Sequence, residues 1–242
     1  MPLPKLDVPI YEVTLPSGKT VSFRPFLVKE EKILLMAAQS KDEQTTLKAI
    51  IQILSNCVVD DIKVTDLPVY DIEYLFLNLR ARSVGEVVDL RYRCNKKDDE
   101  GKVCGTLSEY QVNVLEIKPT VNPDHKATIQ LTPKVGITLR PPKFDLFNKL
   151  QTNKTQDLGA MMTSVLEECI ESIFDATDVY YSKDIPKEEL RQFIDSLSPA
   201  QEKLINQYFE TMPKIQYALK FACPKCGHQE EIVLEGINNF FT

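Results

Sequence analysis

The chain has 242 residues with a formal net charge of −6 at neutral pH, and 43% of its residues are hydrophobic. These values are typical of an ordinary globular protein with one large domain or two interlocked ones, at roughly 100 to 200 residues per domain. The negative charge argues against nucleic acid as a partner, because binding phosphates needs a basic face. No stretch approaches the about 18 to 20 apolar residues that cross a bilayer, so no membrane partner is expected.

The first residues bear on where the protein is made. Met1-Pro-Leu-Pro-Lys5 lacks the apolar segment of a secretory signal, so synthesis in a cytosol is expected. Because a cytosol is reducing, the six cysteines are expected to be metal ligands, core residues or reactive thiols rather than disulfides.

The first third of the chain predicts a β-hairpin followed by three helices. The hairpin covers residues 8–26 and turns at a Pro-Ser-Gly sequence. Apolar residues then recur at helical spacing, which predicts helices over 28–36 and 46–58. A third helix is predicted from a cap at Asp66 to near Gly85, and its apolar character on most sides indicates a buried position.

The middle of the chain predicts strands. A polar tip joins the first two of them, and Cys94 and Cys104 bracket this tip. A Pro-Pro break follows the last of them and suits a boundary between two halves. The predicted strands cover residues 86–93, 105–114, 127–131 and 136–140.

The second half is predicted to be mostly helical. Apolar residues keep helical spacing over 158–174, which predicts one helix of more than four turns with a core face rather than a methionine-rich cofactor box. Asp184 and Ser198 predict the starts of two further helices, and the serine belongs to a capping-box sequence. The last helix is expected to end at Met212, before a proline.

The C-terminal segment predicts a second hairpin that carries cysteines. Strands over 214–222 and 229–235 flank the sequence Cys-Pro-Lys-Cys-Gly-His. Phe240-Phe241 near the end is expected to pack on its own domain, with insertion into a partner as the alternative. The predicted class is therefore α+β, with helical bundle segments, small antiparallel sheets and a split, zinc-ribbon-like four-cysteine site. We expect three parts: a hairpin, three helices and a ligand hairpin at 1–140, a helical region at 141–213, and a zinc-knuckle hairpin at 214–242 packed on the N-terminal sheet.

Four cysteines form the predicted metal site. Cys223 and Cys226 have the spacing of a zinc knuckle, and strand-like residues on both sides favour this interpretation over a thioredoxin-type redox motif. Cys94 and Cys104 supply the other pair, although 118 residues lie between the two pairs. Four cysteine ligands fill the coordination shell, so one structural zinc ion is expected. A site of three cysteines and His228, and thiols without a metal, remain open alternatives.

No catalytic residues are predicted. The chain has two histidines and no recognisable nucleophile elbow, metalloprotease helix or phosphate-binding loop. Neighbouring acidic residues point about 100° apart on a helix, which is typical of a solvated face rather than a catalytic pair. Cys57 and Cys169 lie on apolar helical faces and are expected to be small core residues. No enzymatic activity and no small-molecule cofactor are therefore expected.

Several segments, in family order, are similar to the baseplate hub proteins of T-even-like contractile-tailed phages. They are Leu3-Pro4-Lys5, Arg24-Pro25-Phe26-Leu27-Val28-Lys29-Glu30-Glu31-Lys32, Asp71-Ile72-Glu73-Tyr74-Leu75-Phe76-Leu77, Arg80-Ala81-Arg82-Ser83-Val84-Gly85-Glu86, Phe193-Ile194-Asp195-Ser196-Leu197, Met212-Pro213, Cys223 to Cys226 and Phe240-Phe241.

This resemblance implies a non-enzymatic role in the hub of a phage tail baseplate. The implied partners are other baseplate hub or wedge proteins in a symmetric hetero-oligomeric assembly. The implied location is the virion tail baseplate, with synthesis and assembly in the cytoplasm of the bacterial host. A structural subunit that stays in the virion is favoured, because no disordered arm or exposed apolar groove is apparent. A transient assembly chaperone for the hub is the alternative.

Overall fold

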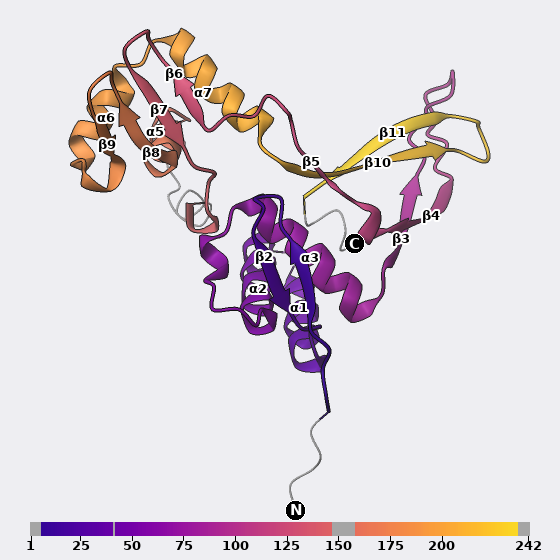
Figure 1. The fold of residues 1–242 in the computed structure, drawn as a ribbon. Coiled ribbons are helices and arrows are strands. Elements are labelled where there is room, and N and C mark those ends of the chain that lie inside the picture. The colour runs from indigo at the N-terminus through magenta and orange to yellow at the C-terminus, as the bar shows by residue number, and fades with distance from the viewer. Residues whose placement is uncertain (1–5, 41, 147–157, 237–242) are drawn as a thin grey trace, which may run out of the picture. The chain divides into compact units, whose positions relative to one another are not determined.

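A computed structural model of the 242-residue chain describes residues 6–40, 42–146 and 158–236 (Figure 1). They divide into two compact units. The first unit comprises the chain up to Val64, Tyr70–Thr120 and the chain from Lys214 on; the second comprises Thr65–Val69 and Val121–Pro213. The sequence placed a boundary after residue 140, whereas residues 121–140 group with the second unit because the second of their two strands pairs with a later strand there. The segments Leu3-Pro4-Lys5 and Phe240-Phe241 lie outside the described residues.

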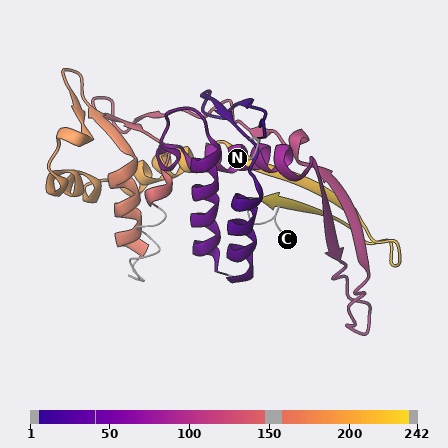
Figure 2. The same ribbon diagram turned by 90° about the horizontal axis from the view of Figure 1, so that it is seen from below.

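The first unit begins with the predicted hairpin and helices, which are confirmed. Strand β1 pairs with β2 in antiparallel register, and Gly18 takes a left-handed conformation (φ 88°) in the turn between them. Helices α1 and α2 lie side by side as an antiparallel pair (Figure 2). The bounds are β1 Tyr11–Thr14, β2 Thr20–Phe23, α1 Val28–Ser40, α2 Glu43–Cys57 and α3 Val69–Val84.

Two buried carboxylates fasten this hairpin to the helices. Glu30 is fully buried, accepts a hydrogen bond from the backbone N–H of Leu27 at 2.8 Å and pairs with Arg24 at 3.0 Å. Asp71 is also fully buried and accepts hydrogen bonds from the backbone N–H and the hydroxyl of Ser17. Because an unpaired buried charge is costly, these partners specify where the hairpin sits on the helices.

Two further hairpins complete the first unit. Strand β3 pairs with β4, and β10 lies between β11 and β5 in a three-stranded antiparallel sheet. Side chains from α3, β3, β4 and β10 form one apolar cluster, so the C-terminal hairpin packs against the earlier one. The bounds are β3 Val87–Arg93, β4 Leu107–Asn113, β5 Pro119–Thr120, β10 Lys214–Ala222 and β11 Gln229–Glu235.

The described part of the second unit contains a four-stranded antiparallel sheet, and helices α5, α6 and α7 pack with it. The strand order of the sheet is β6-β7-β8-β9, and these helices contribute to one core with it. The elements are β6 Thr128–Gln130, β7 Gly136–Leu139, α5 Leu158–Cys169, β8 Ile170–Phe174, β9 Val179–Tyr181, α6 Lys187–Asp195 and α7 Pro199–Thr211. Short 3-10 helices cover Val114–Glu116 in the first unit, Ser182–Asp184 in the second, and Val64–Asp66, where the chain passes from the first unit to the second.

The predicted helix over 158–174 is wrong in its last part. Helix α5 ends at Cys169, and the chain continues directly as strand β8 beside β7. Arg140 explains the ending, because its backbone N–H donates to the Cys169 carbonyl at 2.8 Å and its Nε donates to the Glu168 carbonyl at 2.8 Å. The β-branched Ile170 and Ile173 then suit a strand, with both facing partners on β7.

The two predicted starts of later helices have different outcomes. The capping box of Ser198 is confirmed at the start of α7. Asp184 instead belongs to a 3-10 turn, and Pro186 is the residue before α6. The strands predicted over 214–222 and 229–235 coincide with β10 and β11.

Among the described residues, no helix combines the length and apolar character needed to cross a membrane.

Candidate metal centre

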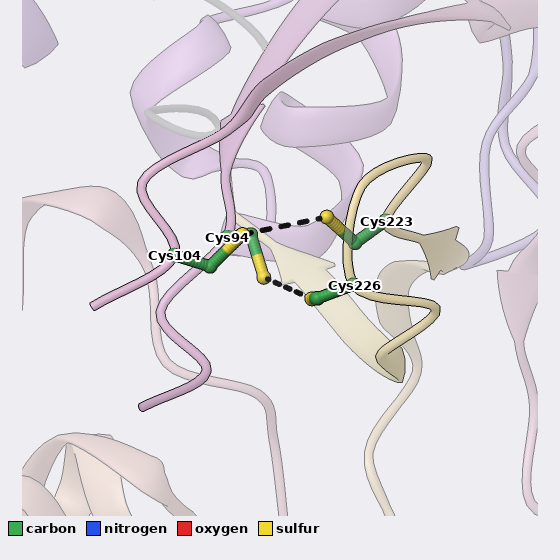
Figure 3. A group of neighbouring side chains, drawn as sticks. All are labelled: Cys94, Cys104, Cys223 and Cys226. Carbon is green, nitrogen blue, oxygen red and sulfur yellow. Dashed lines mark hydrogen bonds between the residues drawn. The ribbon is translucent and has the colours of Figure 1, made fainter. Parts of the chain in front are cut away.

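The four cysteines predicted as ligands lie together at the tips of two hairpins. Cys94 follows the last residue of β3, and Cys104 stands three residues before β4; Cys223 follows β10, and Cys226 stands three residues before β11. Each hairpin therefore offers one cysteine at the end of its first strand and one in its turn. Figure 3 shows the four side chains pointing toward one another from these two loops.

The distances between the sulfur atoms fit a tetrahedral metal site. The Sγ atoms of Cys94 and Cys226 are 3.7 Å apart, and those of Cys104 and Cys223 are 3.9 Å apart. All four sulfur atoms lie within 4.8 Å of one another. Metal–sulfur bonds of about 2.3 Å, the value for zinc, place the sulfurs of a tetrahedron about 3.8 Å apart. These separations are too long for disulfides, in which the sulfurs are about 2.05 Å apart.

Backbone hydrogen bonds shape both loops in the same way. The N–H of Gly105 donates to the Cys94 carbonyl at 2.9 Å, and the N–H of Gly227 donates to the Cys223 carbonyl at 3.0 Å. Both glycines have a positive φ, 66° and 68°, a conformation that other residues rarely adopt. Each glycine follows the second cysteine of its pair. The repeated turn aims each pair of thiols at one point.

Hydrogen-bond donors around two of the sulfurs favour thiolates. The backbone N–H groups of Cys226 and Lys225 lower the pKa of Cys223 to about 6. The hydroxyl of Thr106, 3.3 Å from the Sγ of Cys104, lowers the pKa of that thiol. In contrast, burial raises the pKa of Cys94 to about 12. A cation between the sulfurs favours the thiolate form of all of them, because metal ligands must be deprotonated.

An aromatic cluster supports the site from the side of the strands. The ring of Phe221 is buried and lies 4.5 Å from the ring of Tyr92 and 5.8 Å from that of Tyr110. The Tyr110 hydroxyl donates to the carbonyl of Ala222 at 3.2 Å, and the Tyr92 hydroxyl donates to Glu230 at 2.8 Å. These contacts join the two hairpins without a metal and set the spacing between their tips.

The sequence missed this aromatic support. Phe221 stands two residues before Cys223, so in a strand the two side chains share one face. This alternation of side chains along the strand could have indicated that Phe221 lies beside the cysteine site. The tyrosines belong to a hairpin more than 100 residues earlier, so nothing local indicated that they would meet Phe221.

The remaining candidate residues lie elsewhere. The Nε2 atom of His228 is 3.6 Å from a carboxylate oxygen of Glu230. Among the described residues, the side chains that lie close enough together to hold a metal ion are those of the four cysteines. Cys57 and Cys169 are fully buried, as predicted for core residues, and burial raises their pKa values to about 11 and about 12.

Comparisons with known proteins agree over most of the chain. Residues 8–242 match the protein family described as "T4 bacteriophage base plate protein". The chain is also 24% identical over 225 residues to the "Baseplate hub assembly protein gp26" of Enterobacteria phage T4, which covers 93% of each chain. No solved structure matches the chain. The matched span includes both pairs of cysteines.

Proposed function

The chain belongs to the family of T4 bacteriophage base plate proteins, and on this basis we propose that it acts in building the central hub of a contractile tail baseplate. The resemblance seen in the sequence is thereby confirmed at the level of the family. The observation that carries the proposal is the match, over 93% of both chains, to a protein named for baseplate hub assembly. The chain works in the host cytoplasm, where tails are built, and its site of action is the baseplate.

The proposed role is binding rather than catalysis. The family description and the name of the relative refer to a baseplate component and to hub assembly, and neither names a reaction. Four thiolate ligands leave no open position on a metal for an activated water. We therefore assign the chain to contacts with other baseplate hub or wedge proteins.

Zinc is the proposed metal of the four-cysteine site. The sulfur separations of 3.7 and 3.9 Å match its tetrahedral geometry, and thiolates are ligands that zinc prefers. In this role the ion fixes the tip of the β3–β4 hairpin to the tip of the β10–β11 hairpin. The faces that these hairpins offer to neighbouring proteins are then rigid before assembly begins.

The assembly role and the retained-subunit role differ in where the chain is found. The name of the relative favours a protein that helps the hub to form, whereas the sequence patterns favoured a subunit of the virion. Immunoblots of purified virions and of infected-cell lysates separate them. An assembly protein is abundant in the lysate and depleted from virions; a fixed copy number in every virion would establish the retained subunit.

A deletion tests the role itself. Host cells infected with phage lacking this chain should accumulate tail parts without complete hubs, and expression of the chain in trans should restore baseplates. Complete baseplates in its absence, seen by electron microscopy, would refute the proposed function in both forms.

A further inference from the structure

A groove in the second unit lies between the edge strand β6 and helix α7. Its volume is about 210 Å³. Sites for small molecules usually enclose about 300–1,000 Å³, so this groove suits one or two side chains rather than a whole cofactor. Figure 1 shows α7 running beside β6. The lining residues are Asp124, Lys126, Thr128, Ile129, Gln130, Leu204, Gln207, Tyr208 and Thr211.

The strand wall of the groove offers backbone groups to a further strand. β6 is an edge of its sheet. The backbone N–H of Leu139 donates to Ala127 at 2.8 Å and that of Leu131 donates to Val135 at 3.0 Å, which sets the alternation of the β6–β7 pair. Thr128 and Gln130 therefore direct their N–H and C=O groups away from β7. Within the part of the chain that the structure describes, these backbone groups have no hydrogen-bond partner.

The helix wall offers side chains of a different kind. Leu204 is 41% exposed, so a large apolar side chain stands at the rim of the groove without being covered. Gln207 and Thr211 follow it along the same side of α7, and the buried Tyr208 contributes to the floor. The groove thus pairs hydrogen-bonding backbone on one wall with an apolar anchor point on the other.

Contacts at both ends of the groove join the strand wall to the helix wall and fix the distance between them. Gln201 donates a hydrogen bond from its Nε2 to the carbonyl of Leu131 at 3.3 Å, which ties the start of α7 to the end of β6. At the other end Nδ1 of His125 lies 3.0 Å from the hydroxyl of Thr211, and the His125 ring packs at a tilt of 31° against Tyr208, with centroids 4.8 Å apart. A groove with fixed walls needs little ordering when it binds, which favours affinity.

We propose that this groove binds an extended, uncharged segment of a partner polypeptide, which adds a fifth strand beside β6. Unpaired N–H and C=O groups along an edge strand are complementary to an extended backbone, and a facing helix leaves room for its alternate side chains. The lining carries one Asp and one Lys and is otherwise neutral, so it selects a segment without strong charge. An apolar side chain of that segment would pack on Leu204 and Ile129.

The inference deepens the proposed function by naming a surface that binds a protein partner. It rests on that function only in expecting the partner among the baseplate proteins. The probe is a displayed library of short random peptides, selected against the full-length zinc-loaded chain. Selected peptides should be uncharged. On addition of a selected peptide, the amides of Thr128 and Gln130 should become protected from hydrogen exchange, whereas that of Ile129, already bonded to β7, should change little. Peptides that protect another surface, or no selected peptide, would overturn the inference.

Matched variants locate the binding. Gln130→Pro removes an outward N–H without removing a bond to β7, and it should bind the peptide about tenfold or more weakly than Gln130→Ala, which loses the same side chain but keeps the N–H. Leu204→Lys should weaken binding similarly because it removes the apolar anchor. Val179→Pro, on the opposite edge strand β9, should have no effect. Equal binding by Gln130→Pro and Gln130→Ala would refute strand addition.

The two proposals fail separately. Peptide binding in the groove is measured on the purified chain, so it stands or falls without reference to baseplates. If Leu204→Lys loses peptide binding and the variant phage still builds complete hubs, the groove is not used in assembly and the proposed segment belongs to another partner.

Discussion

The cysteine tips of the first unit and the core of the second unit are held together by different means. At the tips, the buried apolar cluster among the described residues consists of Cys94, Phe221 and Cys223, and two of these are candidate ligands. The core of the second unit gathers eight buried residues from its sheet and helices, again counted within the described segments. Isolated two-stranded hairpins are marginally stable in water. Where the chain buries so little apolar surface, the proposed zinc ion and its four thiol ligands are expected to supply the stability that a core supplies elsewhere.

The largest expected effect is the loss of the metal. Cys226→Ser should abolish tight zinc binding, because structural zinc binding is worth about 10–16 kcal/mol in zinc-finger peptides. Native mass spectrometry should show one zinc ion per chain before the change and none after it. Hydrogen exchange should then accelerate in residues 94–106 and 222–230 while β7 and β8 keep their protection.

A second cysteine serves as the control for this substitution. Cys57→Ala truncates a fully buried side chain outside the site, so it should lower stability and leave one zinc ion bound. A Cys226→Ser chain with normal zinc content, or a metal-free wild-type chain with protected tips, would contradict the metal-held hairpins.

Removal of the Phe221 ring is expected to have the next largest effect. Phe221→Ala should cost about 3–5 kcal/mol locally, because it empties the space between two tyrosine rings that join the hairpins. Hydrogen exchange across β3 and β10 measures the loss. Ile205→Ala, in the core of the second unit, should cost about 2–5 kcal/mol and leave the tips unchanged. An effect of either variant on both units would show that they are not independent.

The pH should affect the first unit through Glu73. Burial, followed by the charge of Glu235, raises the pKa of Glu73 to about 7, whereas an unfolded glutamate has a pKa of about 4.3. Between these pH values the folded state binds more protons than the unfolded state. The stability that Glu73 contributes is therefore fully present below about pH 4 and is lost as the pH rises through about 7. The loss of stability is at most about 4 kcal/mol, at about 1.36 kcal/mol for each unit of pKa difference.

Urea unfolding at pH 5 and pH 8 tests this, monitored through exchange in α3 and β11. Glu73→Gln should unfold at similar urea concentrations at both pH values and should be more stable than the wild type at pH 8. A wild-type chain whose first unit is more stable at pH 8 than at pH 5 would contradict the assignment.

The smallest predicted effect concerns a helix start in the second unit. Ser198→Ala removes the capping-box acceptor of α7 and should cost about 1 kcal/mol. Ser164→Ala, inside α5, is the matched control and should be neutral or slightly stabilising, because alanine has the higher helix propensity. Equal destabilisation by both variants would argue against the cap.

The part of the fold that could be predicted depended on local signals. The strands β10 and β11 and the capped start of α7 carry their information within a few residues, and the structure has them at the predicted positions. The end of α5 could not be predicted in this way. The apolar spacing suits a helix through Phe174, but the hydrogen bonds from Arg140 end the helix at Cys169. A contact between distant segments therefore overrode a local preference.

The sequence by itself determined the candidate ligand residues, since two cysteine pairs, each followed by glycine, are a local pattern with a specific chemistry. Only the tertiary structure decided that the two pairs meet across 118 residues, with Phe221 between Tyr92 and Tyr110 to space them. The same holds for the groove beside β6, whose two walls come from segments about 75 residues apart in the chain. Local propensities act within a few residues, whereas packing and strand pairing bring together residues that no local pattern links.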